Sequence, residues 1–173
     1  MKHALTYFKR VRLPGTALLG GHDKAEDDRT MFFRSIFRVI SGTLSMGGYG
    51  VASHAIMANV AGRYSLRRTV TDTSTGQSRA IATFPTQHGP ILAALATVFV
   101  FREFSQLAHS LFTARTSNVS TKHFIAAVYK ITVMKYNHED SITLADRCGA
   151  QGLFEVNQIS ITNVRLNLIG MTL

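Results

Sequence analysis

Three short stretches of this sequence carry residue types that could bind an anion. Arg68 follows Tyr64 by one helical turn, and a guanidinium group can hold a phosphate through two parallel hydrogen bonds. The turn at 148–152 (CGAQG) has small residues that let backbone amides approach a ligand. The polar stretch 83–88 (TFPTQH) precedes an apolar segment, and the amino end of a helix attracts anions. Each stretch also has a plainer interpretation: a basic helix end, a glycine turn and a helix cap.

Other kinds of site find little support in the residue pattern. No HExxH motif and no GxxxxGK phosphate loop occurs, and the seven histidines are never paired at metal-ligand spacing. Cys148 is the sole cysteine, which rules out an intrachain disulfide and a thiolate zinc cluster and favours an intracellular protein. No His or Asn partner can be placed beside it. His54 lies in an apolar stretch, and we expect it to be a hydrogen-bonded core residue. We predict no metal site.

The charge balance leaves the partner open. The formal charge is +9, from 19 Lys and Arg against 10 Asp and Glu, but the basic residues are scattered and form no long run. A cofactor that carries phosphate suits such a surface as well as nucleic acid does. We predict no nucleic-acid partner. The apolar segment 89–101 is shorter than the ~20 residues of a membrane span, and we predict none.

The elements that would position these residues are mainly helices. Apolar residues make up 46% of the 173 residues, which indicates one domain with a real core. No proline interrupts 30–68, which predicts one long helix with a slim, glycine-rich waist. Apolar residues repeat every three to four positions in 89–113, which predicts a second helix. The same spacing predicts a third helix that begins at Ser120 or Thr121, either of which could cap it, and ends near Arg147.

Three remaining stretches are less regular. The alternation in 7–13 predicts a half-buried strand, yet nothing before it could supply the rest of a sheet. The stretch 69–88 has no strong periodicity and is interpreted as a polar loop, and 153–173 as a short helix with an extended tail. The fold class is therefore all-α, an antiparallel helical bundle with a short remnant β-strand at the N-terminus.

The order of these motifs resembles one flavoprotein family. Residues 8–14 (FKRVRLP) and 18–20 (LLG) resemble the end of the middle sheet domain of acyl-CoA oxidases and dehydrogenases. GRYSLRR at 62–68 looks like the end of the first helix of their carboxyl-terminal bundle, and Thr86-Gln87 like the start of the next helix. DRCGAQGLF at 146–154 is similar to their glycine turn, above all in the oxidases. By this resemblance, 1–20 ends a middle β-domain, 21–29 is a linker and 30–173 is an incomplete helical domain.

The resemblance implies FAD chemistry shared between subunits. Arg68 would bind the pyrophosphate of an FAD held by a neighbouring subunit, and Gly149, Ala150 and Gly152 would approach that FAD. Gln87 is the expected flavin contact at the start of the next helix. The intact enzyme would convert a fatty acyl-CoA into a trans-2-enoyl-CoA in β-oxidation, as a homodimer or homotetramer. In a eukaryote it would lie in the peroxisome, and otherwise in the cytoplasm.

The departures from the family pattern limit what this chain would do alone. Thr43 stands where relatives commonly have an arginine, and Pro85 where they often have a flavin-contacting glutamine. The family's catalytic glutamate would come after Leu173, so we expect no catalytic residue here and an inactive chain. The alternative is a non-catalytic helical oligomerisation module that contributes Arg68 to a partner subunit's FAD site.

Overall fold

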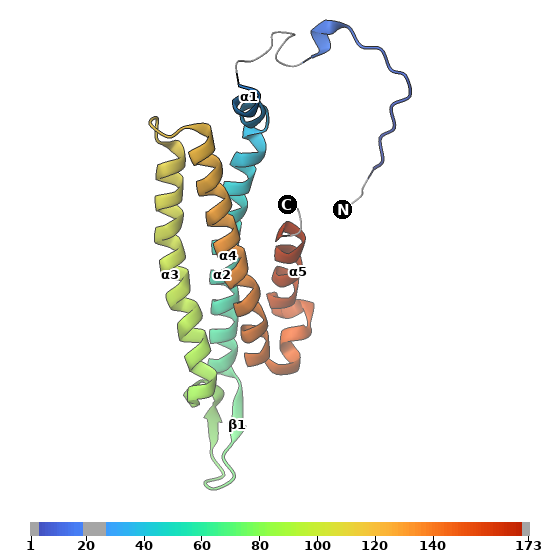
Figure 1. Ribbon diagram of the computed structural model, residues 1–173. Helices are drawn as coiled ribbons and strands as arrows, with labels where there is room; N and C mark the ends of the chain where they lie inside the picture. The colour runs from blue at the N-terminus through green and yellow to red at the C-terminus, as the bar shows by residue number, and fades with distance from the viewer. Residues whose placement is uncertain (1–3, 19–26, 171–173) are drawn as a thin grey trace.

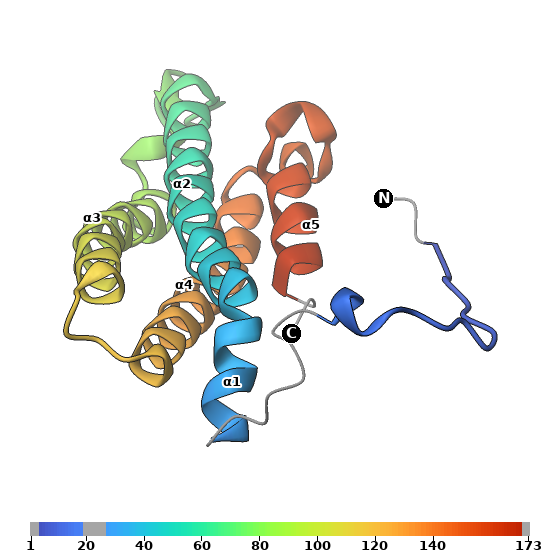
Figure 2. The same ribbon diagram turned by 90° about the horizontal axis from the view of Figure 1, so that it is seen from above.

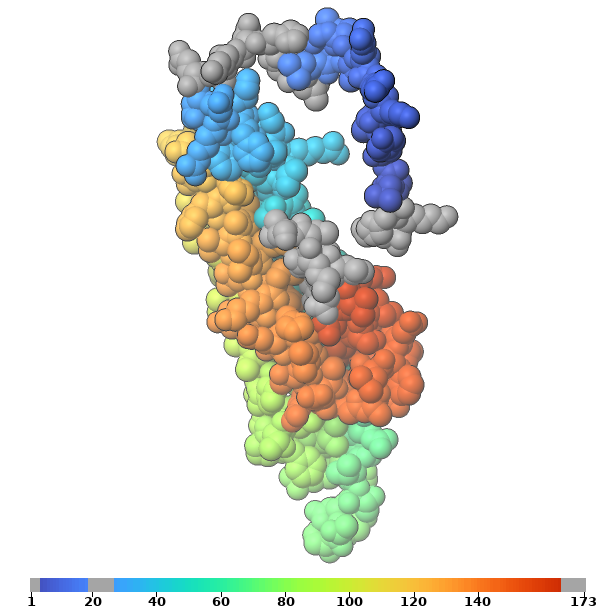
Figure 3. Space-filling model, turned by 45° about the vertical axis from the view of Figure 1, so that its right-hand side comes forward, coloured from blue at the N-terminus to red at the C-terminus, as the bar shows by residue number. Residues whose placement is uncertain are grey.

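Three long helices form an antiparallel bundle in the computed structural model, which describes residues 4–18 and 27–170. They are α2 (Phe37–Arg67), α3 (Pro85–Thr113) and α4 (Val119–Arg147), and they lie side by side (Figure 1). The shorter α5 (Ile159–Gly170) packs against α4 and α2. The space-filling view shows the long axis of the bundle, with α5 on one flank (Figure 3). The predicted all-α helical bundle is confirmed.

The predicted helix over 30–68 is interrupted near its start. A short α1 (Asp28–Ser35) comes first, the backbone leaves helical geometry at Ile36, and α2 begins at Phe37. Asp27 caps α1 because its carboxylate accepts hydrogen bonds from the N–H groups of Arg29 and Thr30, at 3.1 and 3.3 Å. No glycine or proline marks the break, so the sequence pattern gives no sign of it. Most of the expected linker, 21–26, lies outside the described residues.

The strand predicted at 7–13 is wrong. This segment adopts no regular secondary structure, its residues are exposed, and Arg10 has a positive φ of 50°. It stands apart from the helices in two perpendicular views (Figures 1 and 2). The physical reason is that alternating apolar residues form a strand only when a neighbouring strand accepts their hydrogen bonds. The described part of the chain supplies no such strand beside 7–13.

The stretch interpreted as a loop at 69–88 contains regular structure. Strands β1 (Thr69–Thr71) and β2 (Ser78–Ala80) form an antiparallel hairpin, with Val70 opposite Arg79. Asp72 stabilises its turn by accepting the N–H of Ser74 at 2.9 Å. These strands are too short to show a clear alternation in the sequence.

Two predicted helix starts also need correction. The second long helix begins at Pro85 rather than Gly89, because proline at the first helical position has a suitable φ and needs no donor there. The third is capped by Asn118, whose side chain accepts the N–H of Thr121 at 2.7 Å, instead of by Ser120 or Thr121. Its predicted end at Arg147 is confirmed. The final segment is helical to Gly170, and 171–173 lie outside the described residues.

The slim waist of α2 packs inside the chain. A Cβ atom added to Gly47 would overlap the ring of Tyr129 on α4, and one added to Gly50 would lie 2.6 Å from Val133 Cγ1. Asn137 Nδ2 donates to the carbonyl of Gly50 at 2.9 Å, which fixes the two helices at this separation. The glycine-rich waist thus allows two helices to pack closely, and the partner of α2 is α4 of the same chain.

His54 is fully buried at the centre of the bundle. Its Nε2 lies 2.9 Å from Asp140 Oδ2, although the two groups are not aligned as a well-formed hydrogen bond, and its ring meets Phe101 edge-on at 5.8 Å. Burial lowers the pKa of His54, and the Asp140 carboxylate opposes this only in part. The predicted core position is confirmed, but the predicted hydrogen bonding is not, because neither ring nitrogen has a well-aligned hydrogen bond with a described residue.

This burial predicts an acid-sensitive stability. The folded protein binds the imidazole proton less readily than the unfolded chain, in which the pKa is close to the ordinary 6.5. The free energy of unfolding should therefore fall as pH drops below about 6.5, until the lowered pKa of the folded state is passed. Urea unfolding at a series of pH values should show a smaller decrease in His54→Leu. His138→Gln, at an exposed position of α4, should keep the wild-type decrease. Equal decreases in all three proteins would contradict the assignment.

Candidate anion-binding site

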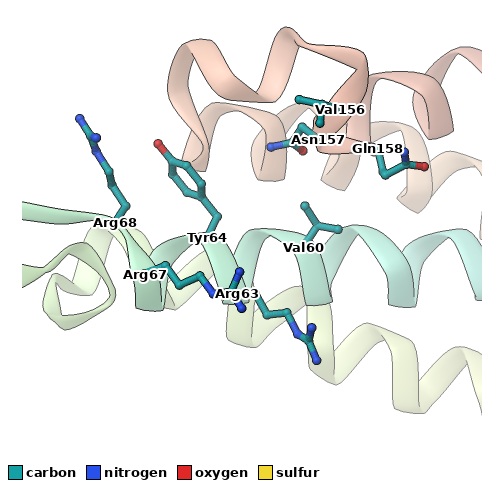
Figure 4. A pocket seen from close by; sticks show the side chains of 8 residues that line it. All are labelled: Val60, Arg63, Tyr64, Arg67, Arg68, Val156, Asn157 and Gln158. Carbon is teal, nitrogen blue, oxygen red and sulfur yellow. The ribbon is translucent and has the colours of Figure 1, made fainter.

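An open hollow lies where the carboxyl end of α2 faces the turn that follows α4 (Figure 4). It has two adjoining parts of about 490 and 430 Å³, which share four lining residues: Tyr64, Arg68, Val156 and Asn157. The first part adds Val60, Arg63, Arg67 and Gln158, and the second adds Cys148, Gly149, Ala150 and Gln151. Segments far apart in the sequence thus form one concave surface.

The end of α2 fixes the position of Arg68. The N–H of Arg68 donates to the carbonyl of Tyr64 at 2.8 Å, while its own backbone is already extended. Its carbonyl accepts the N–H of Ile81 at 2.9 Å, which ties the residue to the base of the hairpin. Figure 4 shows the side chains of Tyr64 and Arg68 on the side of the turn, and those of Arg63 and Arg67 extending elsewhere from α2. Arg68 is exposed and available to a ligand.

Two glycines shape the opposite wall. Gly149 has a φ of +58°, in the left-handed region, and the space where its Cβ would lie is open. Gly152 is buried, and an added Cβ would overlap the backbone carbonyl of Ala145 in the last turn of α4. Gly149 therefore faces the hollow, whereas Gly152 allows the turn to fold tightly onto α4.

Cys148 lies between α4 and this turn. It is 1% exposed, and burial raises the pKa of its thiol, although a hydrogen bond with Asn157 opposes the shift. A protonated, buried thiol makes a poor nucleophile. The Oδ1 atom of Asn157 is itself buried and has no hydrogen-bond partner in the described part of the chain. Asn157 thus has a hydrogen-bond acceptor without a donor, in a residue that lines the hollow.

Gln87 does not line the hollow. Its Nε2 donates to Ser65 Oγ on α2 at 2.8 Å and to the carbonyl of Arg147 on α4 at 2.7 Å. Arg147 Nη1 in turn donates to the carbonyl of Thr86 at 2.8 Å. These three bonds join the ends of α2, α3 and α4, and we call them the three-helix clamp. Both amide hydrogens of Gln87 are thus used within the chain.

The hollow is basic. Arg68 contributes its guanidinium group on the side of the turn, whereas Arg63 and Arg67 line the first part from α2 with side chains that extend elsewhere. No Asp or Glu among the described residues lines either part. Of the predicted site residues, Arg68, Gly149 and Ala150 come together here, while Gly152 and Gln87 lie behind the wall and support it. Sequence reasoning missed Asn157, because a single asparagine after a turn has no distinguishing spacing. Such a surface can hold a phosphate group, with arginine as the donor.

Comparisons with known proteins do not identify a family for this chain. No protein-family model, curated protein or solved structure matches the chain. Among the residues that the structure describes, no cluster of three His, Cys, Asp or Glu side chains could hold a metal ion.

Proposed function

We propose that this chain is the carboxyl-terminal helical part of an acyl-CoA oxidase-type flavoprotein and that its basic hollow binds the pyrophosphate of FAD at a subunit boundary. The observation that carries the proposal is the meeting of Arg68 with Gly149 and Ala150 in one hollow. The resemblance named these residues from separate parts of the sequence. Their proximity is what a shared phosphate ligand would require.

The hollow fits the phosphate portion of FAD on chemical grounds. The Arg68 guanidinium supplies several N–H donors, and no Asp or Glu among the described residues lines the hollow to compete for them. The open space beside Gly149 lets backbone amides face an anion.

The chain's own residues would bind and orient the cofactor. FAD would supply the acceptor for the hydride that leaves the acyl-CoA. No Asp or Glu among the described residues lines the hollow, so its residues supply no carboxylate that could act as the general base. We therefore propose that this part of the chain positions the cofactor and does not abstract the proton.

Replacing Arg68 by alanine should weaken FAD binding about 10- to 100-fold, since a hydrogen bond to a charged group contributes about 1.5–3 kcal/mol. Isothermal titration of the purified chain with FAD measures the change. The binding should be salt-sensitive, because the contact is ionic. ADP, which shares the pyrophosphate, should compete with FAD, whereas riboflavin, which has no phosphate, should not.

The matched control is Arg102→Ala, because Arg102 is an exposed arginine of α3 that does not line the hollow. It removes the same charge and should leave FAD affinity unchanged. Equal losses of FAD affinity in both variants would show that the effect comes from the net charge of the protein and not from a contact with Arg68. Binding of riboflavin as tight as that of FAD would contradict the phosphate site directly.

A further inference from the structure

The outward side of α3 is strongly apolar and has no partner in the described chain. Six large apolar residues on it are between 37% and 66% exposed. We call this surface the outer α3 face, and its members are Leu92, Leu95, Phe99, Val100, Leu107 and Leu111. The opposite side of α3 is already used, because Ala94, Phe101 and Ala108 are buried against the rest of the bundle. Exposed apolar patches of this size mark interaction sites.

The composition of α3 reinforces this conclusion. From Pro85 to Phe101 the helix carries no Asp, Glu, Lys or Arg, and its only formal charges are Arg102 and Glu103. An 18-residue window of α3 has a mean hydropathy of 1.5, yet only 22% of it is buried. By length and composition α3 could cross a membrane, which is weak evidence for a single helix. A core helix of similar hydropathy would be mostly buried.

The surface continues onto α4. A groove of about 400 Å³ runs between the two helices, lined mainly by apolar and aromatic side chains: Ala96, Thr97, Val100, Phe101, Phe104, Thr132 and Tyr136. It leads from Val100 towards Tyr136, which is itself 46% exposed. A partner seated on the outer α3 face would therefore also cover a concave apolar surface.

We propose that the outer α3 face binds the same face of a second copy of this chain, with the two α3 helices antiparallel. A two-fold interface requires a self-complementary surface. Leu92 and Leu107 lie at equal separations before and after the Phe99–Val100 pair, so reversing the helix exchanges the two leucines. Leu92, Phe99 and Leu107 are seven and eight residues apart, about two helical turns in each case, so they lie along one side of α3. Phe99 would then lie near the two-fold axis.

The available area matches what a dimer needs. Six half-exposed Leu, Val and Phe side chains offer on the order of 500 Å² of apolar surface per copy, at roughly 60–120 Å² for each. A standard interface buries about 800 Å² per partner, and in homodimers about 65% of that is apolar. The outer α3 face thus supplies the apolar share without any contribution from residues 4–18.

The neighbouring helix argues against a lipid partner. α4 runs alongside α3 and carries the exposed charges Lys135 and Glu139. Immersing α3 in a bilayer would bring these charges into or against the hydrocarbon, which is strongly unfavourable. A protein partner covers α3 and leaves them in water.

The test is the oligomeric state of Phe99→Glu. The wild-type chain of 19.0 kDa should sediment as a dimer at micromolar concentration, and the variant as a monomer, with a dimer dissociation constant raised at least 100-fold. Two carboxylates would meet at the two-fold axis, and like charges in a desolvated interface repel. Phe99 is 66% exposed, so the variant should fold, which circular dichroism checks. Ile142→Glu, at a 50% exposed position of α4, is the control and should remain dimeric.

A second measurement locates the axis. Cys148 is buried, so Phe99→Cys adds the one accessible thiol among the described residues, and mild oxidation should link two copies. A monomeric wild-type chain, or a dimer unaffected by Phe99→Glu, would overturn the proposal. The proposal would also be overturned if the wild-type chain were a monomer that co-sediments with phosphatidylcholine–phosphatidylglycerol vesicles and the Phe99→Glu variant did not co-sediment with them. The hollow lies between the end of α2 and the turn after α4 and has no lining residue from α3, so FAD titration of the same variant reports separately on the flavin proposal.

Discussion

Replacing Gly152 with alanine is expected to lower the free energy of unfolding by about 3 kcal/mol or more, at the upper end of what overpacking a core does. The added Cβ would overlap the carbonyl and the Cα of Ala145, which are backbone atoms of α4. A flexible side chain could rotate away from such a contact, but a helical backbone cannot. The turn must instead move off the end of α4.

Thermal or urea unfolding measures this change, and a loss of about 3 kcal/mol would lower Tm by roughly 6–12 °C in a chain of this size. The displaced turn would also carry Gly149 away from Arg68, so under the proposed function FAD affinity should fall with stability. Gly89→Ala is the control, because an added Cβ there meets nothing within 4 Å. It should be neutral or slightly stabilising. A Gly152→Ala protein as stable as wild type would show that the turn is loosely packed.

Two neighbouring glycines of α2 should respond to alanine with opposite signs. At Gly47 the new methyl group would overlap the buried ring of Tyr129, which Phe104 and His109 hold from other sides, so we expect a loss of about 1–3 kcal/mol. At Gly48 the methyl group meets nothing within 4 Å, and alanine is the better helix former by about 1 kcal/mol. Gly48→Ala should therefore stabilise the protein.

The expected changes in the free energy of unfolding of these two variants differ by about 3 kcal/mol, which chemical denaturation can resolve. Both substitutions change helix propensity alike, so their difference reports only the contact with α4. Two variants shifted in the same direction would contradict the packing of α2 against Tyr129. A second check is Tyr129→Phe in the Gly47→Ala background, which keeps the ring and should rescue little.

Helix identity followed from the sequence wherever a long apolar periodicity was present. The end of α4 at Arg147 and the buried place of His54 were both predicted correctly, because each depends on a repeating pattern that spans several turns. The break at Ile36 was not, since no glycine, proline or other local signal marks it. The strand at 7–13 failed for the reverse reason: its local pattern is clear, but a strand depends on a neighbour that the described chain lacks.

The site divided along similar lines. Arg68 and Gly149 could be singled out as candidate site residues because their chemistry follows from residue type and position in the sequence. The clamp formed by Gln87 was not visible, because its partners Ser65 and Arg147 are distant in sequence and one of the two acceptors is a backbone carbonyl. Asn157 shows the same limitation, since its unpaired oxygen is a property of burial and not of residue type.

The three-helix clamp has a consequence for motion at this end of the bundle. Helix ends normally fray one at a time, each at its own small free energy. Here one amide group, that of Gln87, bridges the end of α2 to the end of α4, and Arg147 returns a bond to the start of α3. Releasing any one end breaks bonds that hold the others. The two walls of the basic hollow should therefore open together as a single cooperative unit, or remain closed together.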